Sequence, residues 1–182
     1  MIQVKALTLT HRKDLRELAV DFSFVINDGD KAAIIGEEGN GKSTLLKWVY
    51  DPGLIESYCD WSGELAGDPG RLGYLAQDLG EEEKAGSVYD FCAASPDFFD
   101  MTPRELADIA RQLRFPAEEF YSDRPVASLS GGERIKLQLG RLLFSRPAAL
   151  LLDEPSSDLD LETLEWLEDF IGGFPGSVLY IS

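Results

Sequence analysis

Eight consecutive residues, Gly36 to Ser43, have the types and spacing of a loop that binds phosphate groups. They read Gly-Glu-Glu-Gly-Asn-Gly-Lys-Ser and fit the pattern G-x-x-x-x-G-K-[ST] completely. The glycines let backbone N–H groups converge on an anion, and a helix starting at the loop points its positive end toward the same anion. Lys42 can reach the β- and γ-phosphates, and Ser43 can ligate magnesium. The segment therefore predicts a site for a nucleoside triphosphate with Mg²⁺.

The surroundings of the loop support this prediction. An apolar run from Ala32 to Ile35 indicates a buried strand before the loop, and Lys42 to Tyr50 has the pattern of a helix after it. Two acids in the loop, Glu37 and Glu38, would repel a polyanion, so we expect their side chains to point into solvent. The residues expected to contact the nucleotide here are Gly36, Gly39, Asn40, Gly41, Lys42, Ser43 and Thr44.

Two carboxylates, Asp153 and Glu154, end a second apolar run, Leu150 to Leu152. Ligands of open α/β sheets bind at the carboxyl ends of the strands, where these acids would lie. Asp153 is expected to hold magnesium directly or through water, and Glu154 to polarise an attacking water as a general base. Taken alone, the pair could cap the next turn, since Pro155 and Ser156 follow. Beside a phosphate loop, the catalytic interpretation is favoured.

A second glycine motif, Leu129 to Glu133, opens a helix. Ser130 and Glu133 have the spacing of a capping box. No lysine follows the glycines, so the motif is not a second phosphate loop. Its N–H groups at Gly131 and Gly132 and the Ser130 hydroxyl can instead contact the γ-phosphate of a nucleotide held by another molecule.

Apolar patterns and turn residues predict strands that alternate with helices. Three glutamates, Glu81 to Glu83, are expected in a surface loop. The order predicts an α/β fold with a mostly parallel core sheet, an antiparallel β part and an inserted helical lobe. The expected strands are residues 2–10, 18–26, 32–35, 71–76, 148–152 and 177–181, and the longer helices are residues 42–50, 103–115, 131–145 and 161–171.

The length of 182 residues suggests a single domain, residues 1–182. Within it we expect the antiparallel part at residues 1–30 and the helical subdomain, with the Leu129–Glu133 motif, at 79–146. The catalytic core would then be formed by residues 31–78 and 147–182.

The net charge of −16 argues against non-specific nucleic-acid binding by this chain alone. Residues 101–146 differ, because they hold eight of the 17 basic residues; they form either a solvated helical surface or a docking face. Cys59 and Cys92 are expected to be reduced thiols. No apolar run approaches the roughly 20 residues that span a bilayer, and the start lacks the order of a signal peptide. We therefore expect a cytoplasmic chain without direct membrane insertion.

Together these motifs resemble the ATP-binding cassette (ABC) superfamily over essentially the whole chain. The resemblance implies a P-loop NTPase fold that binds ATP with Mg²⁺ and hydrolyses it. It also implies head-to-tail packing with a second cassette, each ATP lying between one Walker A motif and the partner's signature motif. Gln77 would join Ser43 and Asp153 as a magnesium ligand and Lys42 and Glu154 as a catalytic residue. The matching segments are Gly36–Ser43 (Walker A), Gln77 (Q-loop), Leu129–Glu133 (signature), Leu150–Glu154 (Walker B with the catalytic glutamate) and Ser156–Asp160 (D-loop).

The resemblance further implies an aromatic ring near the N-terminus that stacks on adenine. His11 falls roughly there, and a strand-end histidine without a role is the alternative. The family's switch histidine, which contacts the γ-phosphate, would follow the strand that ends at Ile181, and the sequence stops at Ser182. We therefore expect a fragment of a longer protein, incomplete at its C-terminus. Nucleotide binding should survive in it better than turnover, so the isolated chain should have little activity.

Within the superfamily, residues 129–170 look most like ABC-F proteins. These carry two cassettes, lack membrane domains and act on the ribosome as translation or antibiotic-resistance factors, and this chain would be the first cassette. Glu133, the sequence of residues 161–170 and Pro175-Gly176 favour that assignment, whereas Ser157-Asp158 in the D-loop and the acidic charge count against it. The alternatives are the nucleotide-binding subunit of a transporter docked on a membrane permease, and a non-hydrolysing, nucleotide-gated interaction module.

Overall fold

The computed structural model describes residues 1–37, 39–67, 70–157 and 159–182, which form two compact units. The first unit holds Met1–Tyr74, Ala148–Glu154 and Phe174–Ser182, and the second holds Leu75–Pro147 and Pro155–Gly173. Two predictions fall outside the described residues: the solvent-facing side chain of Glu38 and the D-loop position Asp158.

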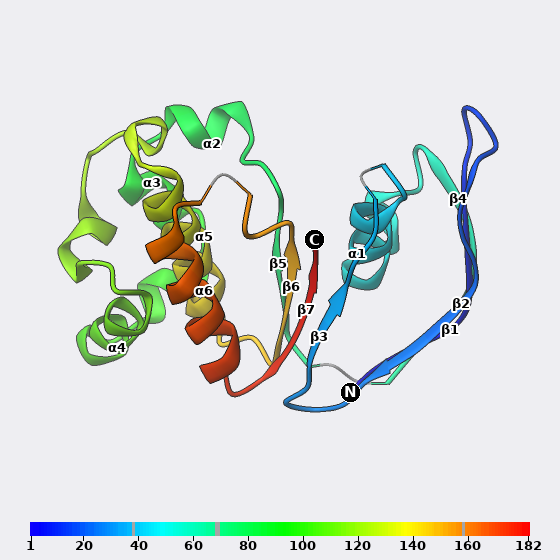
Figure 1. Ribbon diagram of the computed structural model, residues 1–182. Helices are drawn as coiled ribbons and strands as arrows, with labels where there is room; N and C mark the ends of the chain where they lie inside the picture. The colour runs from blue at the N-terminus through cyan, green and yellow to red at the C-terminus, as the bar shows by residue number, and fades with distance from the viewer. Residues whose placement is uncertain (38, 68–69, 158) are drawn as a thin grey trace. The chain divides into compact units, whose positions relative to one another are not determined.

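The first unit begins with an antiparallel sheet in the order β2-β1-β4 (Figure 1). Its strands are β1 (Ile2–His11), β2 (Glu17–Ile26) and β4 (Cys59–Ala66). The pairing of the first two was predicted and is confirmed. Strand β4 was missed, so the antiparallel part is not limited to residues 1–30. Its pattern is hidden because most of β4 is exposed and Gly63, with φ of 124°, lies where a Cβ would come within 2.8 Å of Leu7 Cα.

The second sheet has the order β3-β7-β6-β5. It consists of β3 (Lys31–Ile34), β7 (Ser177–Ile181), β6 (Ala149–Asp153) and β5 (Leu72–Leu75). β3 and β6 both pair with β7 in parallel, which confirms the predicted parallel core of an α/β fold. All five residues of β6 are buried, as its unbroken apolar run requires.

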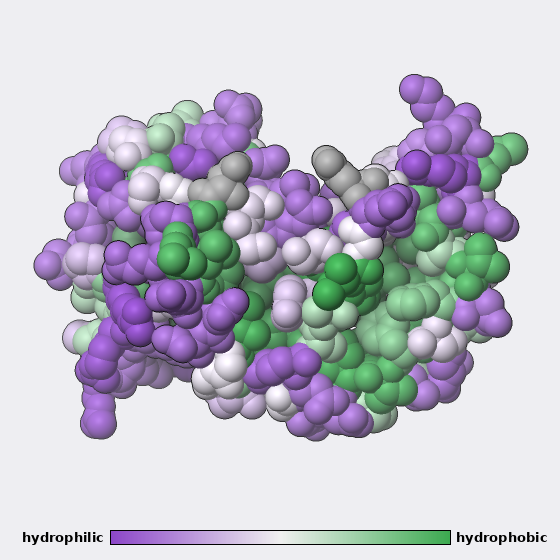
Figure 2. All heavy atoms as spheres, in the orientation of Figure 1, coloured by the Kyte–Doolittle hydropathy of each residue, from purple (hydrophilic) through white to green (hydrophobic). Residues whose placement is uncertain are grey.

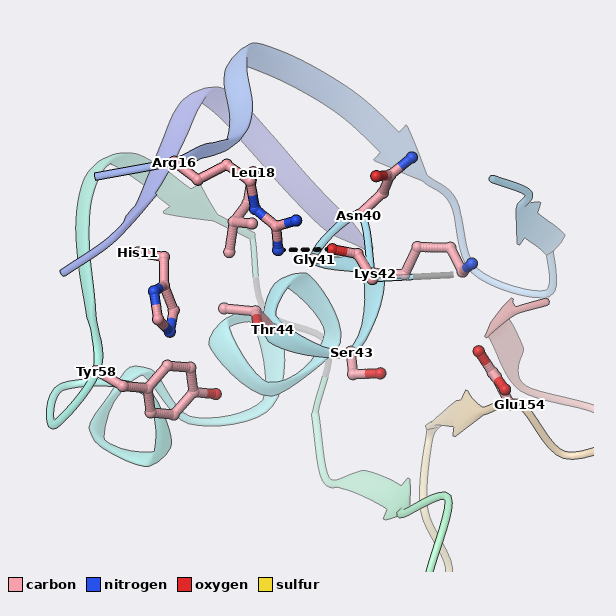
Figure 3. A pocket seen from close by; sticks show the side chains of 11 residues that line it. His11, Arg16, Leu18, Asn40, Gly41, Lys42, Ser43, Thr44, Tyr58 and Glu154 are labelled. Carbon is pink, nitrogen blue, oxygen red and sulfur yellow. Dashed lines mark hydrogen bonds between the residues drawn. The ribbon is translucent and has the colours of Figure 1, made fainter. Parts of the chain in front are cut away.

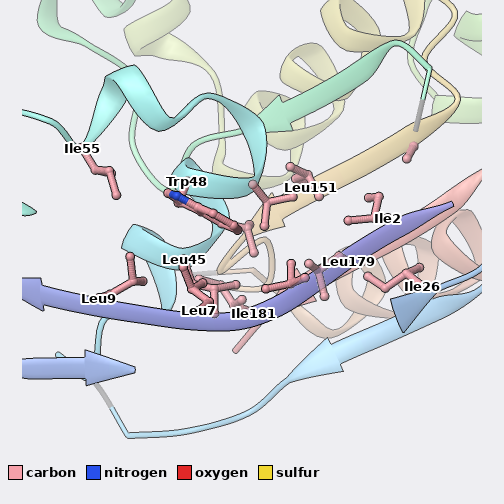
Figure 4. Close-up of a cluster of buried hydrophobic side chains, with 14 of the residues drawn as sticks. Ile2, Leu7, Leu9, Ile26, Leu45, Trp48, Ile55, Leu151, Leu179 and Ile181 are labelled. Atoms are coloured by element: carbon pink, nitrogen blue, oxygen red, sulfur yellow. The ribbon is translucent and has the colours of Figure 1, made fainter. Parts of the chain in front are cut away.

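Helix α1 (Lys42–Tyr50) packs between these two sheets within the first unit (Figure 4). It buries Leu45, Leu46, Trp48 and Val49, a spacing that places all four on one side of a helix. They share a core with apolar residues of β1 and with Leu151, Leu179 and Ile181 of the parallel sheet. A short 3₁₀ helix, Pro52–Leu54, follows α1. The core thereby fixes the start of α1 beside the end of β6.

The second unit is helical. Its α-helices are α2 (Glu81–Ala85), α3 (Val88–Ala93), α4 (Pro103–Leu113), α5 (Gly131–Phe144) and α6 (Leu161–Gly173), with 3₁₀ helices at Pro96–Asp100, Ala117–Tyr121 and Val126–Ser128. The predicted capping box is present at the start of α5, and α4, expected from residue 103, also starts with one, formed by Thr102 and Glu105. The surface loop expected at Glu81–Glu83 is wrong, because these residues open α2. There the Glu83 carboxylate accepts the Gly80 N–H at 3.1 Å, and acids in a first turn favour a helix.

Helix α6 belongs to the second unit, although we expected it in the core segment 147–182. Trp166 donates its indole N–H to the Gln112 carbonyl at 3.3 Å, and the Lys136 ammonium lies 4.9 Å from the centroid of the Trp166 ring. These contacts with the α4 and α5 segments explain the difference in boundary. In the part of the chain that the structure describes, no helix is both long and apolar enough to cross a membrane.

Candidate nucleotide-binding site

A pocket of about 270 Å³ in the first unit gathers most of the predicted nucleotide-binding residues (Figure 3). His11 and Tyr58 lie at one end of it, Lys42 and Glu154 lie toward the other, and Ser43 and Thr44 lie between. The pocket is thus polar at one end and aromatic at the other, as a nucleotide is. Its lining comprises His11, Arg16, Leu18, Gly39, Asn40, Gly41, Lys42, Ser43, Thr44, Tyr58 and Glu154.

The phosphate loop has a backbone that only small residues permit. Gly39 and Gly41 have φ of 78° and 80°, in the left-handed region. A Cβ on Gly41 would also come within 2.6 Å of Leu18 Cβ. α1 begins directly after Gly41 with no side-chain cap and no acid in its first turn. The start of the helix therefore presents backbone N–H groups and the positive end of its dipole, both suited to phosphate.

The Lys42 ammonium is held against the loop itself. It donates to the Gly36 carbonyl and, at 3.1 Å, to the Glu37 carbonyl.

Gly36 lines a second hollow of about 240 Å³ on the apolar side of the loop, where Ile35 is 82% exposed. Hydrophobic surface of the first unit is also visible in Figure 2. Gly36 thus lies outside the lining of the main pocket, and its predicted contact with nucleotide stays a prediction.

Ser43, Asp153 and Tyr74 form a hydrogen-bonded row between α1, β6 and β5. The Ser43 hydroxyl donates to Asp153 Oδ1 at 2.9 Å, and the Tyr74 hydroxyl donates to Asp153 Oδ2 at 3.0 Å. Burial, and after it the Asp153 charge, raise the pKa of Tyr74, so this phenol stays a donor. Tyr74 was not predicted from the sequence, because only the folded sheet brings it to the carboxylate.

The oxygen atoms of this row suit magnesium. A hydroxyl and a carboxylate are hard oxygen ligands, and Mg²⁺ normally takes few protein ligands together with phosphate oxygens and water. No group of three or more His, Cys, Asp or Glu suited to a metal is found among residues 1–37, 39–67, 70–157 and 159–182. Ser43 and Asp153 therefore fit the predicted magnesium site, which a nucleotide would complete.

Glu154 lines the pocket from the end of β6. Its φ of 46° is unusual for a residue other than glycine, and its N–H donates to the Ile181 carbonyl at 3.1 Å. Other residues outside the pocket lining, such as Ala6 and Asp21, have a similar φ, so the conformation alone does not mark a site. The role predicted for the Glu154 carboxylate stays a prediction, supported by its place in the pocket lining.

The aromatic end of the pocket contains His11, the predicted adenine-stacking residue. Its ring centroid lies 6.2 Å from that of Tyr58, and its Nδ1 is 2.9 Å from Asp14 Oδ1. Arg16 donates to the Gly39 carbonyl at 2.8 Å and so ties the turn after β1 to the phosphate loop. Sequence analysis missed Tyr58 and Arg16, since neither lies in a motif.

Gln77, Ser130, Gly131 and Gly132 belong to the second unit, and their contacts with nucleotide stay predictions. There the Ser130 hydroxyl accepts the Glu133 N–H at 3.1 Å, which caps α5. Gly131 is exposed at the start of the helix, whereas Gly132 is buried. The motif thus has the local form of a capped helix N-terminus, at which Ser130 and Gly131 are exposed.

Comparison with known proteins gives this site its context. A family model described as "ABC transporter" matches residues 19–157. Similar proteins include ATP-binding protein Uup of Escherichia coli, 35% identical over 92% of this chain, and the tylosin resistance ATP-binding protein TlrC of Streptomyces fradiae, 29% identical over 96%. The chain spans 26% and 38% of the lengths of these two relatives.

Solved structures with the same fold cover all of this chain. One is an ATP-binding cassette in a dimeric, post-hydrolysis state bound to ADP and Pi, with a TM-score of 0.76, 20% identity and 88% of that chain covered. Another is a nucleotide-free cassette from an ABC transporter, with a TM-score of 0.75, 17% identity and 81% of that chain covered. The predicted fold is thereby confirmed. Because the family model covers most of a chain whose phosphate loop and Ser43–Asp153 contact are those of a nucleotide site, this chain belongs to the ABC transporter family, whose cassettes are ATPases.

Proposed function

We propose that this chain binds MgATP in the pocket of the first unit and hydrolyses it together with a second cassette, as part of an ABC-F protein. The observation that carries the proposal is the junction of α1 and β6, where the phosphate-loop hydroxyl of Ser43 meets the buried carboxylate of Asp153 at 2.9 Å. A glycine-rich loop alone can be an ordinary turn, and an acid at a strand end alone can cap the next turn. The two in contact favour a nucleotide site.

The residues of the loop bind and orient the triphosphate. The start of α1 offers N–H groups, and Lys42, already at the loop, would exchange its carbonyl partners for phosphate oxygens. The adenine would occupy the aromatic end of the pocket, near His11 and Tyr58. These contacts position the nucleotide before any chemistry takes place.

Hydrolysis requires a base and a way to neutralise charge on the phosphates. Ser43 and Asp153 would hold magnesium, which when bound neutralises charge that develops on the β- and γ-phosphate oxygens. Glu154 would accept a proton from the attacking water. Gln77 would add a further magnesium ligand, as the family resemblance implies.

The second cassette supplies the other half of the site in this proposal. Ser130 and Gly131 are exposed at the start of α5, where they suit the γ-phosphate of a nucleotide bound to the partner cassette. A solved relative of the same fold is a dimer with ADP and Pi. The proposal is further supported by the lengths of the relatives, since 26% of Uup leaves room for another cassette in one chain.

The ABC-F assignment is supported by the similarity to Uup and to a protein named for tylosin resistance. On this assignment the protein would act in the cytoplasm, with the ribosome as its partner. Co-sedimentation of the longer protein with ribosomes tests this assignment, with wild type compared with Glu154→Gln in the presence of ATP. We expect the Glu154→Gln variant to stay on ribosomes only when ATP is present.

Two other outcomes would support the alternatives. Fractionation of both forms with a membrane permease would support the transporter alternative. ATP binding without any hydrolysis by the longer wild-type protein would indicate a nucleotide-gated module.

A further inference from the structure

Three aromatic side chains lie exposed and close together on the second unit. Phe99 is 65% exposed, Tyr121 60% and Tyr89 36%. All three contact the buried ring of Phe98, with centroid distances of 5.6, 5.4 and 6.3 Å. Tyr89 and Tyr121 also stack on each other at 6.5 Å. We refer to Tyr89, Phe99 and Tyr121 as the aromatic surface.

The fold holds this surface in place. Tyr89 lies on α3, and its N–H donates to the Ser122 carbonyl at 3.0 Å, which joins α3 to the 3₁₀ helix that carries Tyr121. Phe98, beneath the three rings, packs on Phe144 of α5 at 5.1 Å. Most residues on the visible face of the second unit are hydrophilic (Figure 2), and grouped exposed aromatic rings mark interaction sites.

The two chain segments that carry the aromatic surface are acidic, although Lys84, Arg104, Arg114 and Arg124 flank them in the sequence. Its rings come from residues 85–103 and 115–123, and these two segments contain no lysine or arginine. A cationic partner is attracted by such a surface, whereas RNA phosphates and anionic lipids are repelled. The carboxylates of the two segments are Asp90, Asp97, Asp100, Glu118, Glu119 and Asp123.

The basic residues of the same unit are largely engaged with neighbouring acids. This favours the solvated-surface interpretation of residues 101–146 over a basic docking face. The ion pairs are Arg111–Asp108 at 2.9 Å, Arg114–Asp169 at 3.4 Å, Arg124–Glu133 at 2.6 Å, Arg141–Glu83 at 2.7 Å and Arg146–Glu105 at 2.5 Å.

We propose that the aromatic surface docks a lysine- and arginine-rich segment of a partner protein. The partner's cations would lie over the rings and pair with the surrounding carboxylates. The fold already uses this contact internally, because the Arg141 guanidinium lies 3.7 Å from the centroid of the Phe91 ring. The surface does not involve nucleotide, so its test stands apart from the proposed ATPase function.

The test is fluorescence anisotropy of a labelled nona-arginine peptide titrated with this chain at fixed ionic strength. The double variant Phe99→Ser/Tyr121→Ser keeps the net charge, so general attraction to an acidic protein is unchanged. We expect affinity to fall about 5- to 20-fold, since two exposed cation–π contacts are lost. The matched control Val20→Ser/Leu161→Ser removes side chains that are 60% and 72% exposed elsewhere, and it should bind like wild type.

A second pair of variants tests the carboxylates at equal loss of charge. Asp100→Asn/Asp123→Asn should weaken binding more than Glu165→Gln/Glu168→Gln on α6. Circular dichroism of each variant verifies folding. Each of three results would overturn the proposal. The first is an equal loss of affinity in the two charge variants, and the second is wild-type affinity of the aromatic variant. The third is displacement of the peptide by poly(U) RNA that binds to the same residues.

Discussion

Among the residues that the structure describes, Asp153 is the one charged residue that is buried, at 2% exposure. A buried carboxylate is costly unless its oxygen atoms are hydrogen-bonded. Here Ser43 and Tyr74 each satisfy one oxygen. Two hydroxyls thus fix the direction of the acid that is proposed to hold magnesium, and one of them, that of Tyr74, lies outside the pocket lining.

Replacing Tyr74 by Phe should lower both the affinity of the site for the divalent metal ion and the stability of the fold. The Asp153 Oδ2 atom would lose its donor, which costs about 1–3 kcal/mol for a buried acceptor. We expect a several-fold weaker Mn²⁺ affinity in the presence of ATP, measured by electron paramagnetic resonance, and a lower free energy of unfolding in urea. Tyr50→Phe is the matched control, since the Tyr50 ring stacks on Tyr74 with a centroid distance of 5.3 Å, whereas the two Asp153 oxygens accept from Ser43 and Tyr74. Wild-type values for Tyr74→Phe in both measurements would contradict this role.

Residues within a contiguous motif could be predicted, and residues that reach the site through space could not. Lys42, Ser43 and Asp153 carry their meaning in local spacing, and the structure brings Ser43 and Asp153 into contact as expected. Arg16 enters the same pocket from the turn after β1, and Tyr58 enters it from the segment before β4. No spacing in the sequence relates them to the loop.

At the scale of elements, the start of α5 depends on close packing with α6. A Cβ on Gly132 would lie 2.5 Å from Thr163 Oγ1. The Thr163 N–H in turn donates to Asp160 Oδ1 at 2.8 Å, which caps α6. The second glycine of the signature motif therefore has a structural reason that is independent of nucleotide.

Gly132→Ala should destabilise the second unit, because overpacking of this kind costs about 1–3 kcal/mol. Gly172→Ala provides the comparison: it lies in α6, where a Cβ would meet nothing within 4 Å, and it should be neutral or slightly stabilising. Urea unfolding followed by circular dichroism measures both. A Gly132→Ala variant as stable as Gly172→Ala would show that α5 and α6 are not in this contact.

Two capping carboxylates predict how the second unit responds to acid. The Arg124 guanidinium and the Ser130 N–H lower the pKa of Glu133 from 4.5 to about 2, and hydrogen bonds from Thr102 lower that of Glu105 equally. Groups with a lowered pKa stabilise the fold above pH 4.5, and that stability is lost as pH falls toward 2. The thermal midpoint should therefore decline across this range. Glu133→Gln should decline less steeply, whereas the exposed-site control Glu82→Gln should follow wild type; identical profiles for all three would refute the assignment.

Elements with strong end signals were predicted well. Capping boxes and glycines defined α1, α4 and α5 to within about two residues. Short elements were not: α3 has six residues, and β4 is an exposed edge strand interrupted by Gly63. Their formation depends on contacts with distant segments rather than on local periodicity, which is why the sequence left them undefined.

At the scale of the whole molecule, the proposed catalytic cycle needs a second cassette. In the proposed two-cassette protein, the Glu154→Gln variant should bind ATP and retain it. Only the water-activating base is lost in this variant, while the contacts with the phosphates remain. Size-exclusion chromatography with radiolabelled ATP should show slow release of nucleotide and turnover lowered at least about 100-fold, within the range for loss of a general base. Turnover near the wild-type rate would exclude Glu154 as the base.

The central claim is that the loop from Gly36 to Ser43 holds a triphosphate, and titration calorimetry of this chain with MgATP tests it most directly. Lys42→Ala removes the one side-chain cation of the loop, whereas Lys47→Ala removes a lysine from the last turn of the same helix. We predict measurable binding by wild type and Lys47→Ala, and loss of binding by Lys42→Ala. Equal ATP affinity in wild type and Lys42→Ala would contradict the account.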